Sequence, residues 1–134
     1  MNWTPEQYRA FQAKKIGKRI DKKLKFGNNP KIYNDVKYAS TKEANYARDL
    51  DLLKRVGEIL DWEYEPRFIF YAYGARITSY KIDFKIIHKD KSIEYVEIKG
   101  GKATQTQAWR IRWKFLKAYL AENEPDSKLT LKEN

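Results

Sequence analysis

Two short apolar segments joined by a polar loop constrain the fold of this chain more than any other feature. Residues 80–87 and 92–99 are rich in β-branched and aromatic side chains, and the connecting segment from His88 to Lys91 is polar. Segments of this length and composition, bounded by a polar turn, are typical of neighbouring β-strands. We therefore predict a β-hairpin at this point of the chain.

Three charged side chains lie on these predicted strands, Asp83 on the first and Glu97 and Lys99 on the second. Because side chains alternate between the faces of a strand, Glu97 and Lys99 point to the same face. A hairpin loop of three residues places position 83 opposite position 97, so that Asp83 shares that face. A loop of two or four residues without a bulge places the two carboxylates on opposite faces.

The shared face has a defined chemistry. Two neighbouring carboxylates repel each other unless a cation lies between them, and their hard oxygen atoms suit Mg²⁺ or Mn²⁺. The nearby Lys99 would then orient or help to deprotonate an attacking water, or stabilise the charge that develops on a phosphate. The pattern indicates a metal-dependent phosphodiesterase centre, and the alternative is a hairpin with ordinary charged residues on its solvated face.

A third carboxylate, Glu43, lies at the start of a predicted helix. Ser40 with Glu43 three residues later has the form of a capping box, and the helical pattern continues to about Val56, where Gly57 ends it. Glu43 is thus a candidate helix cap. The helical projection also places it within an apolar stripe, where a carboxylate needs a partner that a metal site would supply. The stripe consists of Tyr46, Ala47, Leu50 and Leu53.

A helical Glu, then Asp on one strand and Glu-x-Lys on the next, followed by a helix, resembles the PD-(D/E)xK nuclease superfamily. This superfamily includes many restriction enzymes and the archaeal-type Holliday junction resolvases. The chain resembles most closely a group of small phage-encoded members, over roughly residues 25 to 132. The matching segments are Lys25–Asn29, Tyr38–Ala44, Gly57–Ile59, Glu65–Phe68, Tyr80–Phe84 and Val96–Gly100. One departure is Ile82, which replaces the proline that gives the superfamily its name.

The resemblance implies an α/β fold in which helices flank a mixed β-sheet, as in the restriction-endonuclease-like core. It implies that Glu43, Asp83 and Glu97 bind Mg²⁺ or Mn²⁺ together with the Ile98 backbone carbonyl, and that Lys99 is the catalytic lysine. The implied activity is that of an endonuclease on branched DNA, with Holliday junction resolution first. Symmetric resolution needs two sites, and so a C₂ homodimer.

Two alternatives remain open beside this function. One is a nuclease of another specificity, such as a nicking, restriction-like or exonucleolytic enzyme, because only the likeness to a family favours branched DNA. The other is a non-catalytic module that binds nucleic acid.

The overall charge favours a nucleic-acid partner. The sequence contains 28 Lys and Arg against 18 Asp and Glu, a formal charge of +10 and a pI of about 9.6, as expected for a protein that binds a polyanion. No apolar run is long enough to span a membrane, and there is no signal-peptide pattern.

The absence of cysteine excludes Cys-based zinc sites and disulfides. It is consistent with the cytoplasm, that of the host if the protein is phage-encoded.

The positive charge is concentrated near the start of the chain. Thr4 as N-cap and Pro5 at the first helical position predict a helix from Pro5 to about Lys23. We predict that its basic residues contact DNA, and the alternative is a solvated arm with ordinary surface lysines. These residues are Lys14, Lys15, Lys18, Arg19, Lys22, Lys23 and the adjacent Lys25.

A further helix is predicted from about Gln105 to Ala121, with Thr104 and Gln107 as its capping pair. Its polar face and the segment before it add further predicted DNA contacts, namely Lys102, Arg110, Lys114 and Lys117. Its apolar residues form two arcs, of which one should pack on the sheet. The second arc is a candidate dimer contact, or else lies under the N-terminal helix. The first arc is Ala108, Ile111, Phe115, Ala118 and Tyr119, and the second is Trp109, Trp113, Leu116 and Leu120.

The predicted order of elements is helix, short hairpin, helix, three or four strands, helix and a last strand at about Lys128–Leu131. This order predicts an α/β sandwich around a mixed sheet. A chain of 134 residues can bury one core but not two. We therefore predict one nuclease domain over residues 1–134, with the basic helix in 1–24 and the nuclease core in 25–134.

Overall fold

The computed structural model describes residues 4–9 and 29–133. The chain divides into two compact units, residues 1–59 and residues 60–134. Most of the predicted basic helix lies outside the described residues. So do the predicted DNA contacts Lys14, Lys15, Lys18, Arg19, Lys22, Lys23 and Lys25.

Thr4 begins a helix in the first unit, as predicted. Its Oγ1 accepts a hydrogen bond from the Gln7 N–H at 3.1 Å, and the Gln7 Oε1 accepts one from the Thr4 N–H at 2.9 Å. These reciprocal bonds satisfy backbone donors that the first helical turn leaves without partners. Residues 5–9 are helical.

A short hairpin packs on a helix in the same unit. The strands β1 (Ile32–Tyr33) and β2 (Val36–Lys37) are joined by Asn34 and Asp35, both with positive φ, which is the geometry of a tight two-residue turn. The Tyr33 hydroxyl donates a hydrogen bond to Asp51 Oδ2 at 2.6 Å. This bond ties the hairpin to α2 (Thr41–Arg55), which carries Asp51. After the helix, Gly57 adopts a φ of 80° that favours glycine.

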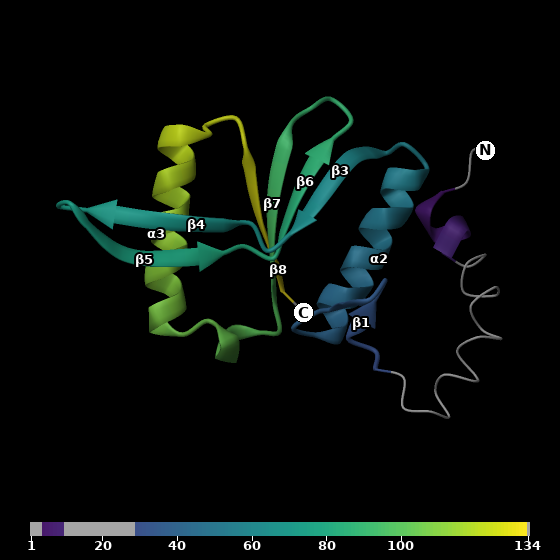
Figure 1. Ribbon diagram of the computed structural model, residues 1–134, viewed down its shortest axis with the longest axis horizontal. Coiled ribbons are helices and arrows are strands. Elements are labelled where there is room, and N and C mark those ends of the chain that lie inside the picture. Colours follow the sequence, from purple (N-terminus) through teal and green to yellow (C-terminus); the bar gives the residue numbers. More distant parts are fainter. Residues whose placement is uncertain (1–3, 10–28, 134) are drawn as a thin grey trace. The chain divides into compact units, whose positions relative to one another are not determined.

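The second unit contains a four-stranded mixed sheet. Its strands are β3 (Ile59–Tyr64), β6 (Phe84–His88), β7 (Ile93–Lys99) and β8 (Lys128–Glu133), in the order β3-β6-β7-β8. β6 is antiparallel to β7, whereas β8 is parallel to it (Figure 1). The mixed α/β architecture predicted from the sequence is therefore present, with β7 between two neighbours.

A separate hairpin, β4 (Arg67–Ala72) and β5 (Ala75–Lys81), precedes β6. The prediction of one continuous strand over residues 80–87 was wrong, because β5 ends at Lys81 and β6 begins at Phe84. Two backbone hydrogen bonds hold the corner between them: the Ile82 N–H donates to the Pro66 carbonyl at 3.2 Å, and the Glu65 N–H donates to the Asp83 carbonyl at 2.9 Å. Five strands thus lie between α2 and the last helix, instead of three or four.

The last helix, α3 (Gln107–Asn123), begins two residues later than predicted. Thr106 is its N-cap and accepts a hydrogen bond from the Trp109 N–H at 3.1 Å. Thr104 instead ends a 3₁₀ turn, η1 (Lys102–Thr104), in which its hydroxyl donates to the Gly101 carbonyl at 2.6 Å. Both threonines carry a side chain that can cap a helix, so the sequence did not distinguish them.

The second apolar arc of α3 packs inside the second unit, whereas only Phe115 and Tyr119 of the first arc do so and Ala108, Ile111 and Ala118 are exposed. Trp109, Leu116 and Leu120 are buried in its hydrophobic core, and Trp113 packs against that core. The interpretation of this arc as a dimer contact was therefore wrong for its buried members. On the other arc, Phe115 stacks on Phe70 of β4 with ring centres 5.7 Å apart. The helix α3 thus packs against the β4–β5 hairpin as well as against β7 and β8.

No helix in the described ranges 4–9 and 29–133 is long and apolar enough to cross a membrane.

Candidate functional site

Asp83 and Glu97 meet where β6 begins. The pairing of Phe84 with Val96 continues by one step to place position 83 opposite position 97. The His88 N–H donates to the Ser92 carbonyl at 2.8 Å, which leaves three residues in the loop and selects the first of the registers considered from the sequence. Asp83 Oδ2 accepts a hydrogen bond from the Ile98 N–H at 2.7 Å, so this carboxylate is held against β7 beside Glu97.

Glu97 is a buried acid within the sheet. It is only 6% exposed and lies on β7 opposite Leu131 of β8. Burial raises the pKa of Glu97, whereas the Tyr80 hydroxyl, the Lys99 charge and the Asp83 backbone N–H lower it. Its Oε1 atom is buried, and no group among the described residues donates a well-formed hydrogen bond to it. An incompletely satisfied buried carboxylate is uncommon in folded proteins and points to a further partner.

Lys99 is held close to this acid by three neighbours. Its Nζ lies 3.9 Å from Glu97 Oε2, 4.8 Å from the centre of the Trp109 ring and 3.4 Å from the Thr104 carbonyl oxygen, to which it donates. The Lys99 side chain is only 17% exposed. A cation over an aromatic face and beside a carboxylate has a restricted position, so the ammonium group is directed towards the acid pair.

Tyr80 and Trp109 form a second layer behind the charged residues. The Trp109 Nε1–H donates a hydrogen bond to the Tyr80 hydroxyl at 2.7 Å, and that hydroxyl lies near enough to Glu97 to lower its pKa. Burial raises the pKa of Tyr80, and the neighbouring Glu97 charge raises it further. The sequence interpretation missed both residues as parts of the site, although Tyr80 belongs to the Tyr-x-x-Asp-Phe motif that was recognised.

Glu43 lies in the first unit, at the start of α2. Its backbone N–H donates to Ser40 Oγ at 3.1 Å, and the Ser40 hydroxyl donates to Glu43 Oε2 at 2.9 Å. The side chain is therefore part of the helix cap, and at 7% exposure it also lies on the buried face of α2, as the projection predicted. Its role as a ligand for the metal of the second unit stays a prediction.

The side chains at the acid pair can be examined for donor atoms that fit a divalent metal ion. Within the part of the chain that the structure describes, no three side chains of His, Cys, Asp or Glu are grouped as metal ligands. Asp83 and Glu97 nevertheless provide adjacent carboxylate oxygens, one of them buried without a hydrogen-bond donor. Oxygen donors of this kind fit Mg²⁺ or Mn²⁺.

The remaining predicted DNA contacts that fall within the described residues are all exposed on η1 and α3. They are Lys102, Arg110, Lys114 and Lys117. Lys117 also lines a pocket of about 490 Å³ between α3 and β8, together with Trp113, Leu129 and Leu131. Neither Asp83, Glu97 nor Lys99 lines this pocket, so it is separate from the acid pair.

The fold and the site define a mixed α/β protein with an acid pair and a partly buried lysine at the junction of two neighbouring strands. A model of a protein family of unknown function, DUF1064, matches residues 23–128. Because the match covers most of the chain, the protein belongs to this family. Neither the curated proteins nor the solved structures gave a match.

Proposed function

We propose that this protein is a Mg²⁺- or Mn²⁺-dependent DNA endonuclease that hydrolyses phosphodiester bonds. One observation carries the proposal: the Asp83 and Glu97 carboxylates lie together, Glu97 Oε1 is buried without a donor, and the Lys99 ammonium is 3.9 Å from the other Glu97 oxygen. A salt bridge that served stability alone would be expected to satisfy its buried oxygens. The arrangement instead leaves an acceptor for a cation from solution.

Asp83 and Glu97 would hold the ion together with the Ile98 backbone carbonyl, and Glu43 is the proposed further ligand. The bound ion would supply Lewis-acid stabilisation of negative charge on the phosphate. Asp83 is half-buried and therefore open to solvent on one side. The more deeply buried Glu97 provides the fixed negative charge that the ion requires.

Lys99 would act on the substrate. Its position between the Trp109 ring and Glu97 keeps the ammonium group at the edge of the acid pair. From there it would orient the attacking water or stabilise charge developing on the phosphate, and a charge fixed in a partly buried site is more effective than one in water. Lys102, Arg110, Lys114 and Lys117 would hold the flanking phosphate backbone.

We propose branched DNA as the substrate, and Holliday junctions first, because the order of residues resembles the PD-(D/E)xK nucleases. The acid at the start of β6, the Glu-x-Lys on β7 and the following α3 agree with a restriction-endonuclease-like core. The protein would act in the cytoplasm in DNA recombination. A homodimer would provide two sites for paired cuts, and its contact would have to lie outside the buried Trp109, Leu116 and Leu120.

The test is a panel of linear, flapped and four-way DNA substrates incubated with the full chain and Mg²⁺. The wild-type protein should cut at least one of them, and Asp83→Asn should abolish cleavage while DNA binding is kept or tightened, because the repulsion from phosphates is relieved. Glu63→Gln removes an exposed acid from β3 and should cut normally. Equal loss of binding and cleavage in Asp83→Asn would indicate a structural role, and a wild-type protein that binds every substrate but cuts none would be a binding module.

A further inference from the structure

The β4–β5 hairpin carries an unusual concentration of exposed apolar side chains. Ile69, Tyr71 and Ile77 are 38%, 68% and 51% exposed, and Tyr73 at the tip is fully exposed. They account for four of the six exposed large hydrophobic residues described in the second unit. Figure 1 shows the hairpin extending beyond α3. Exposed apolar side chains gathered on one short element indicate a binding surface.

The same hairpin is strongly basic. Residues 67–81 include Arg67, Arg76 and Lys81 and no acidic residue, and all three cations are exposed. Arg67 and Lys81 are directly opposite each other across the two strands, an arrangement of like charges that destabilises a hairpin. Neither forms an ion pair within the described residues. An anion bound between them would remove the repulsion.

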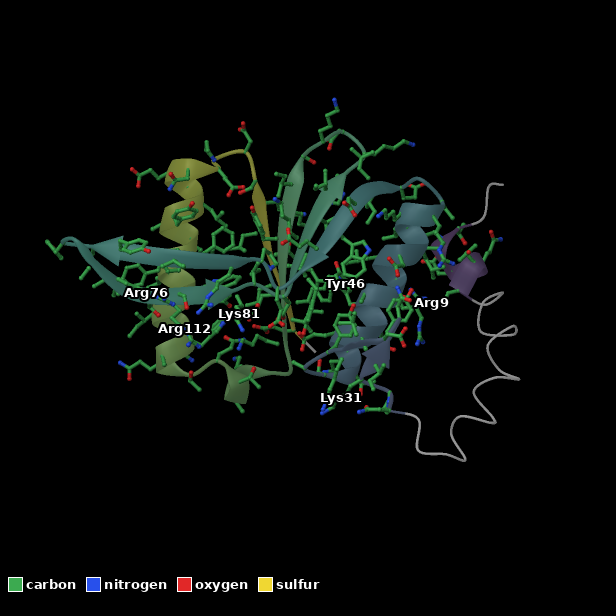
Figure 2. All side chains as sticks on the ribbon, in the orientation of Figure 1. Arg9, Lys31, Tyr46, Arg76, Lys81 and Arg112 are labelled. Carbon is green, nitrogen blue, oxygen red and sulfur yellow. The ribbon has the colours of Figure 1, made fainter. Side chains whose placement is uncertain are left out.

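Arg112 of α3 adds to this positive surface. Tyr80 of β5 packs against Trp113 of α3 with ring centres 6.0 Å apart, so the helix and the strand are neighbours. In the view of Figure 2, Arg76 and Lys81 of β5 and Arg112 of α3 project onto the region where β5 crosses α3. Arg112 and its neighbours Arg110 and Lys114 are exposed, so α3 adds positive charge beside the hairpin.

The tip of the hairpin carries an aromatic residue in a backbone conformation that does not favour it. Tyr73 and Gly74 have φ values of 53° and 75°, the geometry of a two-residue turn in which Asn or Gly is the usual first residue. A tyrosine in this left-handed region is strained. Its ring is fully exposed and so contributes no burial to the folded unit. The aromatic ring is thus available for a partner.

The base of the hairpin adjoins the acid pair. Lys81 lies two residues before Asp83, and hydrogen bonds from Ile82 to Pro66 and from Glu65 to Asp83 hold the corner. At a rise of about 3.3 Å per residue, the five steps from Lys81 to Arg76 span roughly 17 Å. A two-stranded ribbon fits the major groove of a DNA duplex. A phosphate bound through the metal ion proposed at Asp83 and Glu97 would therefore have its neighbouring duplex within reach of the ribbon.

We propose that the β4–β5 hairpin is a DNA-binding ribbon that lies along a duplex arm next to the cleavage point. Arg67, Arg76, Lys81 and Arg112 contact phosphates, and the Tyr73 ring stacks on an unpaired base where the arm meets the branch. The proposal rests on the proposed function, whose substrate it describes in more detail. Charge complementarity favours DNA over a lipid surface, because Arg67 and Lys81 lie at the base of the ribbon, Arg76 lies near its tip, and no acidic residue lies between them.

The first experiment measures the phosphate contacts. Binding of the full chain to a labelled four-way junction is followed by fluorescence anisotropy over a series of salt concentrations, without divalent ions so that no cleavage occurs. Arg76→Ala and Lys81→Ala should each weaken binding and reduce the slope of log K against log salt by about 0.9. Lys89→Ala is the matched control, because it removes an exposed cation from the loop at the other hairpin of this unit, and it should bind as the wild type does.

The second experiment measures the aromatic contact. A junction with 2-aminopurine at the branch point should show quenched fluorescence with wild-type protein and with Tyr73→Phe, but not with Tyr73→Ala. Loss of one stacked base should weaken junction binding by roughly 5- to 150-fold, while binding to a linear duplex changes little. Circular dichroism should show unchanged folding in each variant, because the altered side chains are exposed.

Three outcomes would overturn the proposal that the β4–β5 hairpin binds DNA. If the hairpin variants bind the junction as Lys89→Ala does while the wild type cuts DNA, the hairpin does not bind DNA, but the proposed nuclease activity is retained. If the wild type neither binds nor cuts DNA, both fail. If Tyr73→Ala loses binding to phosphatidylglycerol vesicles but not to DNA, the tip belongs to a lipid surface.

Discussion

Glu97→Gln should make the protein more stable while it removes the proposed activity. The carboxylate is 6% exposed and one of its oxygens has no hydrogen-bond donor among the described residues. A buried group left unsatisfied in this way costs about 1 to 3 kcal/mol, and a neutral amide is less costly to bury than a carboxylate. We therefore expect the midpoint of thermal unfolding in EDTA to rise by roughly 3 to 12 °C.

The stability difference between Glu97→Gln and the wild type should depend on pH. Because burial raises the pKa of Glu97 in the folded protein above its ordinary value of 4.5, its contribution to stability is fully present below that value. The contribution is lost as the pH rises through the raised pKa. The stability gained by Glu97→Gln should accordingly be small in acid and grow as the pH rises. Unfolding followed by circular dichroism at several pH values measures it.

Glu94→Gln is the matched control, three residues away on the same strand. Burial would raise the pKa of Glu94, but hydrogen bonds from Thr130 and His88 outweigh it and lower that pKa. Its contribution to stability is thus present above the ordinary value and is lost as the pH falls through the lowered pKa. Glu94→Gln should destabilise the protein at neutral pH.

Divalent ions should make the wild type more stable than Glu97→Gln, which reverses the order expected in EDTA. Mg²⁺ at a hundredfold excess over its dissociation constant would stabilise wild-type protein by about 2.7 kcal/mol, and it should leave Glu97→Gln nearly unchanged. The reasoning is refuted if Glu97→Gln is less stable than the wild type in EDTA, because Glu97 would then be a satisfied structural acid. A wild-type midpoint that does not respond to Mg²⁺ or Mn²⁺ would rule out the metal site.

Three further predictions follow from the same site and core. Lys99→Ala should reduce turnover far more than DNA affinity in single-turnover assays, because one ammonium is a small part of a footprint of many phosphates; cleavage near the wild-type rate would remove Lys99 from the mechanism. Tyr80→Phe removes a group that lowers the pKa of Glu97, so NMR titration should show that pKa rise further, and an unchanged value would contradict the contact. Trp113→Glu should unfold the protein by circular dichroism, because Trp113 packs on the core; a folded monomer in sedimentation would restore the dimer contact.

Side-chain alternation linked the register to the length of the hairpin loop, but the sequence left that length open, and the bond from His88 to Ser92 selects the register that places Asp83 opposite Glu97. The corner at Ile82 and Asp83 was not predictable in this way, because it depends on backbone hydrogen bonds to Glu65 and Pro66, which are distant in the sequence. An apolar run such as residues 80–87 indicates burial, but it does not show that its first residues belong to the β4–β5 hairpin and its last residues to the four-stranded sheet.

The role of Trp109 shows a similar limit. A helical projection separated its arc from the first apolar arc of α3, but it contained no information on how many elements pack around that helix. The β4–β5 hairpin provides the additional partner, and Trp109 is consequently buried and bonded to Tyr80. The polar neighbours of a tryptophan depend on tertiary packing, so its contact with Lys99 had no signal in the sequence.

The parallel pairing of β7 with β8 has a consequence for synthesis on the ribosome. β8 follows every other element in the sequence, yet it is the strand that covers the outer edge of β7, including the position opposite Glu97. Until β8 has been translated and has docked, β7 is an edge strand with open backbone groups that can pair with other chains. The nascent protein thus passes through a stage in which the acid pair is incompletely enclosed, and β8, which is translated after the other strands of this sheet, is the strand that completes the enclosure.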